Sequence, residues 1–397
     1  MSGAIKKKQT IEVEHSMEKL TIPYIEGDGT GRDIWNASRP VFEEAVLKAL
    51  EGRKQIQWIP LLAGQKALDR DGVLLSEETL GQIRHHGLAL KGPLTTPVGG
   101  GFRSINVHLR QVLDLYVCLR PVRYFAGLPS PLKHPEKVDL IIFRENTEDL
   151  YKGIEWKSGS AEARSVLGFL KEKMQVDLPW DTGLGVKPIS KGATQRFVRF
   201  AFDYAIRNRR KRLTIVHKGN IMKFTEGAFR EWVYETAKEY TTSISTEEEK
   251  TKILINDRIA DNMFMQAIQK PEEYDILLCP NLNGDYLSDA CAALIGGLGV
   301  APGANIGDTV AVFEPTHGSA PKYADKDLVN PTSFLLSGAM LFRHIGYDNV
   351  ARRIEQAVED TIRAGIVTYD LARQMQGVRP VKCSEFGKQV ARRIGKE

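Results

Sequence analysis

Residues 274–290 read YDILLCPNLNGDYLSDA, an apolar run followed by a polar stretch that carries Asp285 and Asp289. The apolar part is typical of a buried strand, and the polar part predicts a helix that begins at the turn around Gly284. Aspartates four positions apart lie on one face of a helix. Because carboxylate oxygens are the ligands that hard divalent cations prefer, this stretch predicts a metal site in an α/β protein.

Strand and helix candidates alternate along the rest of the chain, which favours an α/β fold with a largely parallel or mixed sheet and flanking helices. The predicted strands are 20–27, 55–61, 87–92, 113–122, 139–146, 213–219, 274–281 and 309–315. The predicted helices are 33–50, 76–86, 191–207, 224–238, 259–270, 284–295, 332–345 and 349–364. Residues 151–190, rich in Gly, Pro and Trp, predict an insertion with its own small β structure.

The composition excludes several classes of protein. A chain of 397 residues is too long for one ordinary core, so two domains are expected. No apolar run approaches the roughly 20 residues that span a bilayer. Without an apolar signal segment either, the sequence predicts a cytoplasmic protein with no membrane partner. The cysteines are expected to be reduced core thiols: Cys118, Cys279, Cys291 and Cys383.

The basic run RNRRKR at 207–212 suggests nucleic-acid binding at first sight. However, the formal net charge is only +5, and no nucleic-acid motif accompanies the run. The run closes an amphipathic stretch, where cations complement the C-terminal dipole of a helix. The sequence therefore predicts no nucleic-acid partner, and oligonucleotide binding is the alternative from a different class of protein.

Arginines are concentrated between residues 103 and 144. The series comprises Arg103, Arg110, Arg120, Arg123 and Arg144. Arg120 and Arg123 follow one predicted strand and Arg144 ends the next, and strand ends in open α/β sheets are where ligands bind. Because guanidinium groups bind carboxylates in a bidentate manner, a series of them beside a metal site predicts a small, multiply anionic substrate.

The segment KGPLTTPVGGGFRSINVHLRQ at 91–111 leads from a strand end into the first turn of a helix. Ser104 and Asn106 would present polar groups there, and Asn106 shares a helix face with Arg110. Together they would bind a carboxylate at the positive end of the helix. Ser104 would equally serve as a simple N-cap, and the sequence leaves both interpretations open.

Two further segments bear on a cofactor. The turn YIEGDGTGRDIW at 24–35 has G-x-G-x-G spacing, a weak dinucleotide fingerprint that a tight turn explains equally well. If Lys322 and Tyr323 meet Tyr369 and Arg373, their cations and phenols form a cluster that suits a phosphate monoester. NAD would require an acidic group for its ribose hydroxyl, so this cluster predicts NADP.

Taken together, these segments resemble the NADP-dependent isocitrate dehydrogenases of the bacterial homodimeric type, in the isocitrate/isopropylmalate dehydrogenase family. Matching runs extend in order from about residue 20 to the C-terminus, among them PYIEGDGTG, FRENTEDLYKGIEW, VHKGNIMKFTEGAF, NLNGDYLSDA and THGSAPKYA. The resemblance implies a nonclassical dinucleotide fold without the Rossmann motif. It further implies a large domain (1–115 and 296–397), a small domain (116–148 and 191–295) and a clasp insertion (149–190) that interlocks two subunits of a homodimer.

The resemblance also implies roles for single residues. Isocitrate would be bound by Ser104, Asn106, Arg110, Arg120 and Arg144. Mg²⁺ or Mn²⁺ would be bound by Asp285, Asp289 and the partner's Asp261. NADP would contact Thr95, His317, Gly318, Ser319, Ala320, Pro321, Lys322, Tyr323, Asn330, Tyr369 and Arg373. The catalytic residues would be Tyr151 and, from the neighbouring subunit, Lys218.

The implied reaction converts isocitrate to 2-oxoglutarate and carbon dioxide with reduction of NADP⁺, as in the tricarboxylic acid cycle and the glyoxylate bypass. The hydroxyl proton would leave towards Lys218, and Tyr151 would protonate C3 after decarboxylation. The alternatives are a related dehydrogenase acting on 3-isopropylmalate, homoisocitrate or tartrate, and an isocitrate dehydrogenase that prefers NAD. Ser104 also matches a serine that a dedicated kinase phosphorylates in some relatives, which implies a regulatory partner.

Overall fold

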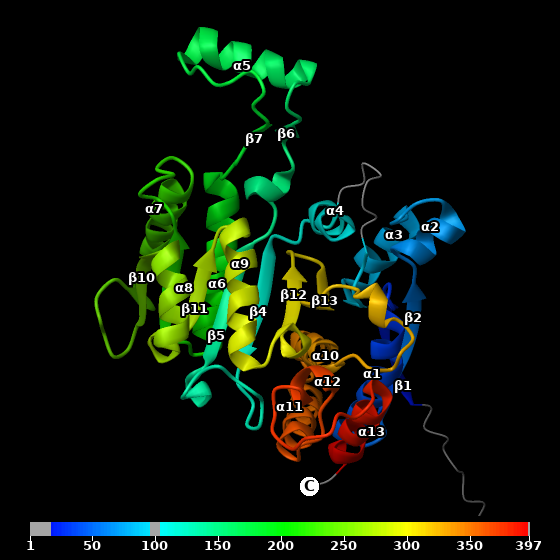
Figure 1. Ribbon diagram of the computed structural model, residues 1–397. Helices are drawn as coiled ribbons and strands as arrows, with labels where there is room; N and C mark the ends of the chain where they lie inside the picture. The colour runs from blue at the N-terminus through cyan, green and yellow to red at the C-terminus, as the bar shows by residue number, and fades with distance from the viewer. Residues whose placement is uncertain (1–16, 96–103, 396–397) are drawn as a thin grey trace, which may run out of the picture.

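The computed structural model describes residues 17–95 and 104–395, and its framework is a mixed β-sheet (Figure 1). Within those residues the sheet has eleven strands in the order β2-β1-β3-β13-β12-β4-β5-β11-β8-β10-β9. Their bounds are β1 (Glu18–Ile25), β2 (Lys54–Leu61), β3 (Leu88–Lys91), β4 (Val117–Arg123), β5 (Asp139–Glu145), β8 (Arg212–His217), β9 (Ile244–Ser245), β10 (Ile253–Ile259), β11 (Ile276–Cys279), β12 (Pro302–Ile306) and β13 (Ala311–Pro315). Strands β4 and β12 run antiparallel to their neighbours and the other pairs are parallel, so the predicted α/β fold with a mixed sheet is confirmed.

The strand order brings both ends of the chain into one half of the sheet. Strands β1, β2 and β3 from the beginning of the chain lie beside β12 and β13 from its end. The other half consists of strands from the middle of the chain. The two halves join where β12 pairs with β4, from Ala304 opposite Leu119 to Ile306 opposite Val117.

Helices flank this sheet (Figure 1). Their bounds are α1 (Gly31–Ala49), α2 (Gln65–Asp71), α3 (Glu77–His86), α4 (Ile105–Val112), α5 (Ala161–Met174), α6 (Lys191–Arg207), α7 (Glu226–Ala237), α8 (Ala260–Gln269), α9 (Asn281–Ala292), α10 (Thr332–His344), α11 (Asp348–Arg363), α12 (Tyr369–Ala372) and α13 (Cys383–Ile394). Helices α1 and α13, from opposite ends of the chain, pack closely because position 387 is glycine: a Cβ there would lie 2.2 Å from the Ala37 carbonyl oxygen. In the described ranges, no helix has the length and apolar character needed to cross a membrane.

The insertion projects away from the sheet at the top of Figure 1. It contains β6 (Glu155–Trp156), which pairs antiparallel with β7 (Leu184–Gly185), and the 14-residue helix α5 between them. The small β structure expected from the sequence is therefore only a two-residue ribbon, and the helix is the larger part. Ser160 begins α5 by accepting a hydrogen bond from the Ala163 backbone N–H at 3.1 Å.

Several elements differ from the sequence-based prediction. Helix α9 begins at Asn281 instead of residue 284, so Gly284 lies inside the helix and not in a turn. Strand β12 was not predicted because its sequence, PGANI, has low β propensity, and burial within the sheet overrides that preference. Strand β10 and helix α13 were also missed. The short edge strand β9 lies in a polar region for which no element was predicted.

Candidate active site

Several of the predicted site residues meet where helix α9 packs against strands β4 and β5. Arg144, on β5, forms an ion pair with Asp285 on α9, and its Nε donates to the Asn281 Oδ1 at 2.8 Å. Tyr151 lies in the 3₁₀ turn Asp149–Lys152, and its hydroxyl donates to the other carboxylate oxygen of Asp285. The Arg144 guanidinium also lies 4.6 Å from the centroid of the Tyr151 ring. Asp285 therefore binds the guanidinium of Arg144 and the phenol of Tyr151, which come from two other segments.

Gly284 allows α9 to come this close to β5. A Cβ at this position would lie 2.7 Å from the Cβ of Arg144 and 3.1 Å from that of Cys279. Any larger residue would push the helix off the strand. Gly284 is thus required by packing against the buried arginine stem.

Arg120 binds the second aspartate of α9. Its Nη1 lies 3.1 Å from the Asp289 Oδ1, 3.8 Å from the Asp285 Oδ1 and 2.6 Å from the Ser288 hydroxyl. The Arg120 side chain is 10% exposed, and that of Asp289 is 53% exposed. Asp285 and Asp289 are therefore partly exposed to solvent, whereas the guanidinium groups that they contact are buried.

Helix α4 brings three more predicted residues to this region. Ser104 is its N-cap, accepting from the Val107 N–H at 3.5 Å, so the capping interpretation holds. The Asn106 Oδ1 is buried and has no hydrogen-bond partner among the described residues. The Arg110 Nη2 donates to the Glu314 Oε1 at 3.0 Å, whereas its buried Nε has no partner in that part of the chain. Unsatisfied buried polar atoms of this kind are what a bound ligand would satisfy.

The electrostatics of the site favour an anionic ligand. Burial, and then the neighbouring Arg110, lower the pKa of Arg144, because the desolvated cations repel one another. Burial raises the pKa of Asp285, but the ion pair with Arg144 and the hydrogen bond from Tyr151 outweigh it, and the net direction is down. Burial raises the pKa of Asp289. An additional negative charge would relieve the repulsion among the arginines.

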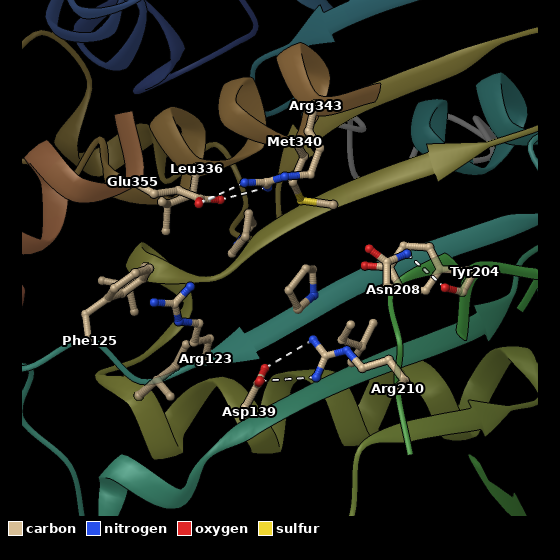
Figure 2. Close-up of a pocket in the computed structure, with 15 residues that line it drawn as sticks. Arg123, Phe125, Asp139, Tyr204, Asn208, Arg210, Leu336, Met340, Arg343 and Glu355 are labelled. Carbon is tan, nitrogen blue, oxygen red and sulfur yellow. Dashed lines mark hydrogen bonds and ion pairs between the residues drawn. The ribbon is translucent and has the colours of Figure 1, made fainter. Parts of the chain in front are cut away.

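Arg123 was predicted in the anion site with Arg120 and Arg144, and this prediction is wrong. Residues three apart on a strand point to opposite faces. Figure 2 shows Arg123 beside Phe125 in a different cavity of about 210 Å³, with its guanidinium 5.4 Å from the Phe125 ring centroid. Arg103 lies outside the described residues.

Two cations of the basic run at 207–212, Arg210 and Arg212, form ion pairs within the protein. The Arg210 Nη1 lies 2.8 Å from the Asp275 Oδ1 and 3.1 Å from the Asp139 Oδ2, and Figure 2 shows the pair with Asp139. Arg212 donates to the Glu273 carbonyl at 3.1 Å. These contacts join the start of β8 to Asp139 at the start of β5 and to the segment that precedes β11.

Lys218 and Asp261 lie apart from the aspartates of α9 and form an ion pair with each other. Lys218 follows β8, and Asp261 is in the first turn of α8. Across the described ranges, no three His, Cys, Asp or Glu side chains are grouped closely enough to hold a metal. Asp285 and Asp289 supply hard oxygen ligands of the right kind, but one chain does not complete the set.

Six of the eleven predicted cofactor residues line a cavity of about 440 Å³ between the loop after β13 and helix α12, namely His317, Gly318, Ala320, Tyr323, Asn330 and Tyr369. The rings of Tyr323 and Tyr369 are stacked with centroids 5.7 Å apart, so the two segments meet as the sequence predicted. The His317 ring lies in the same wall, and burial lowers its pKa. Lys322 and Arg373 are exposed and are not among the residues that line this cavity.

The glycine turn at 26–31 supports this loop. The Thr30 N–H donates to the Ser319 carbonyl at 2.9 Å, and the Thr95 hydroxyl contacts the Ser319 hydroxyl. Gly29 has φ +56°, and a Cβ there would lie 2.1 Å from the Ser319 carbonyl oxygen. The turn therefore positions the cofactor loop from behind, which the weak fingerprint did not reveal.

The sequence did not identify Glu314 and Lys91. Glu314, on β13, lies 2.6 Å from the Lys91 Nζ and binds Arg110, and its amide neighbour Asn305 donates at 2.6 Å. Burial raises the pKa of Glu314, but Lys91 and Arg110 lower it far more. The sequence feature that could have identified Glu314 is its position as a charged residue within the apolar run VAVFEP.

Known proteins match this chain over most of its length. The family model described as Isocitrate/isopropylmalate dehydrogenase matches residues 21–390. The protein named Isocitrate dehydrogenase [NADP] from Archaeoglobus fulgidus is 54% identical over 94% of this chain and 92% of its own length. Its namesake from Streptococcus mutans is 52% identical over 93% of this chain and 94% of its own. The crystal structure of isocitrate dehydrogenase from Methylococcus capsulatus superposes with a TM-score of 0.81 at 40% identity, covering 95% of this chain and 99% of that one.

We predict that Glu314→Gln destabilises the protein by about 3–5 kcal/mol at pH 7, because Lys91 and Arg110 would remain buried without their anion. The folded-state pKa of Glu314 is depressed, so its contribution is present above the ordinary pKa of 4.5 and is lost as the pH falls below it. Urea unfolding of both proteins at pH 7 and pH 3.5 should show a smaller difference at the lower pH.

The control for this prediction is Glu239→Gln, which removes an exposed partner of Arg199 and should leave stability nearly unchanged. An equal effect of the two substitutions at pH 7 would contradict the role given to Glu314.

Proposed function

The chain belongs to the isocitrate/isopropylmalate dehydrogenase family, and on this premise we propose that it oxidatively decarboxylates isocitrate with NADP⁺. The observation that carries the substrate assignment is the convergence of Arg110, Arg120 and Arg144 beside two aspartates. Isocitrate has three carboxylates, and three guanidinium groups suit it, of which Arg110 and Arg144 each keep an unsatisfied N–H donor among the described residues. The enclosed Asn106 amide favours this polar substrate over 3-isopropylmalate, whose isopropyl group would require an apolar wall.

The NADP assignment is supported by the stacked tyrosines and by two exposed cations close to them in the sequence. Lys322 and Arg373 flank Tyr323 and Tyr369 in sequence, and both are exposed where a 2′-phosphate would lie. When bound, the nicotinamide supplies the acceptor for hydride. The chain's own contribution is to orient it against the substrate through Thr95, the loop at 317–323 and Asn330.

A divalent metal would be held by Asp285 and Asp289, with the set completed by the partner's Asp261. Mg²⁺ or Mn²⁺ at this place supplies a Lewis acid next to the substrate hydroxyl. Among the described residues no further His, Cys, Asp or Glu joins this pair, so a partner's carboxylate would complete the set. Asp261 is 68% exposed and stands on α8, from which it would reach a neighbouring subunit.

Proton transfer is assigned to two residues of this chain. Lys218 would accept the proton of the substrate hydroxyl when hydride leaves C2, and it stands beside Asp261, which is proposed to reach a partner subunit. After loss of carbon dioxide, Tyr151 would donate its proton to C3. Burial and the hydrogen bond to Asp285 raise the pKa of Tyr151, which keeps this acid protonated at neutral pH.

The test of this function is the appearance of reduced cofactor with purified protein. We expect metal-dependent turnover with threo-isocitrate and NADP⁺, abolished by chelation, and a kcat/KM about 10⁴-fold lower with 3-isopropylmalate. Equal rates with NAD⁺ would contradict the phosphate cluster, and faster turnover of 3-isopropylmalate would contradict the role of Asn106.

A homodimer is proposed from the apolar surface of the insertion. Phe169, Met174 and Trp180 are 52%, 57% and 73% exposed, and such a patch marks an interface.

The strand order supports the proposed large domain (1–115, 296–397), small domain (116–148, 191–295) and clasp (149–190). The free, buried cysteines support a reducing, cytoplasmic location.

We predict that the chain sediments as a dimer and that Trp180→Glu shifts it towards the monomer, because a charge would be buried in the interface. Sedimentation velocity at several concentrations measures this shift, and Trp58→Phe, within the large half, is the control. A native monomer at micromolar concentration would contradict the dimer.

Regulation by phosphorylation of Ser104 is a further part of this proposal. Ser104 begins α4 beside Asn106 and Arg110, so a negative charge there would repel a substrate carboxylate. Ser104→Asp should lower kcat/KM for isocitrate by about 10²-fold or more, whereas Ser104→Ala should cost about tenfold or less through the lost hydrogen bond. Phosphate mapping of the native protein tests the modification itself, and equal effects of both substitutions would oppose it.

A further inference from the structure

A buried ionic triad lies beneath the active site, at the point where the insertion returns to the sheet. The Lys187 Nζ lies 2.6 Å from the Asp149 Oδ1 and 2.9 Å from the Glu226 Oε1. The exposed fractions of the three side chains are 14%, 1% and 0%. Buried charges of this kind are costly, so their arrangement calls for an explanation.

Asp149 connects the triad to Tyr151 and to helix α9. Its Oδ2 accepts from the Leu282 N–H at 2.9 Å, in the first turn of the helix that carries the two aspartates of the site. Its Oδ1 also accepts from the Leu150 N–H at 2.7 Å, and Asp149 begins the 3₁₀ turn that holds Tyr151. The residue adopts φ +66°, a conformation that costs energy outside glycine and that these contacts maintain. One carboxylate thus fixes two segments of the site.

Glu226 connects the triad to Lys218. Its Oε2 accepts from the Lys218 backbone N–H at 2.6 Å and from the Asn283 Nδ2 at 2.9 Å. Asn283 belongs to the first turn of α9, so this second carboxylate also reaches the same helix. Only Lys187 supplies a cation between the two carboxylates within the described residues.

We infer that Lys187 is a positioning residue for the reaction: it holds Asp149 and Glu226 together, and through them Tyr151, the start of α9 and Lys218. This inference rests on the proposed function for the roles of Tyr151 and Lys218. Without Lys187, two buried carboxylates would repel each other, and the segments that they hold would separate. A displacement of about 1 Å at reacting groups lowers a rate by about 10²-fold.

The position of Lys187 in the chain gives the triad a second consequence. Lys187 stands two residues after β7, on the return limb of the insertion, and the Asp149 N–H donates to the Pro188 carbonyl at 2.9 Å. The insertion is therefore attached to the catalytic segments by an ion pair and a backbone hydrogen bond. A change in how the insertion is seated would be transmitted to Tyr151 through these contacts.

Kinetics of Lys187→Met test the inference. We expect kcat for isocitrate to fall by about 10²-fold, with KM for NADP⁺ within twofold of native, because no residue of the cofactor loop contacts the triad in the described ranges. Lys187→Arg retains the cation and should recover at least tenfold of the lost kcat. The control is Lys191→Met, four residues after Lys187 in the sequence. It removes an exposed ion pair with Glu235 and should leave kcat within twofold of native. An unchanged kcat in Lys187→Met, or no recovery by arginine, would overturn the inference.

Amide hydrogen exchange tests the same inference without turnover. In Lys187→Met and in Glu226→Gln, exchange should accelerate at Leu150, Lys218 and Leu282, whose N–H groups the triad holds, while the β1 amides stay protected. Unchanged exchange at these three amides refutes the triad's role whatever the substrate is. By contrast, if exchange accelerates in these variants but the native protein does not oxidise isocitrate, only the proposed function is overturned.

Discussion

The burial of Arg144 is the constraint on which the rest of the site depends. A guanidinium that is 1% exposed retains its charge only if acceptors are supplied from within the protein. Asn281 and Asp285 supply them, so α9 must begin directly behind β11 and must approach β5 over Gly284. The contact that makes the buried cation tolerable is therefore also the contact that places a carboxylate at the site. One N–H group, Nη2, has no partner among the described residues and completes the case for an anionic ligand.

Much of the fold and part of the site could be predicted from local pattern. The apolar run and the aspartate pair at 274–290 predicted a strand and a helix, and the structure contains both, with the helix beginning three residues earlier than expected. The sequence analysis made the phosphate site conditional on contact between the segments of Tyr323 and Tyr369. The structure meets this condition, because the two rings are stacked. Assigning Arg123 to the site failed because strand periodicity was not applied to it.

The remaining features depend on contacts between distant segments, which no local pattern contains. Glu314 is read in sequence as a polar break in a strand, and only the fold shows that Lys91 and Arg110 neutralise it. Lys187 lies in an irregular insertion, where a lysine is ordinarily solvated, yet it is the centre of a buried cluster. The glycine turn at 26–31 supports the cofactor loop from behind by backbone contact, which differs from the direct phosphate contact that a fingerprint implies.

The strand order also has a consequence for how the chain is synthesised. Strand β3 pairs with β13, so that Leu88 lies opposite Ala311, and β1 is separated from the C-terminal strands only by β3. Nearly the whole chain must leave the ribosome before this half of the sheet closes. The strands β4 to β11 are synthesised much earlier and pair among themselves. The middle of the protein can therefore fold before β12 and β13 are available to pair with the N-terminal strands. Until translation is almost finished, the β3 edge stays open and exposed to pairing with other chains.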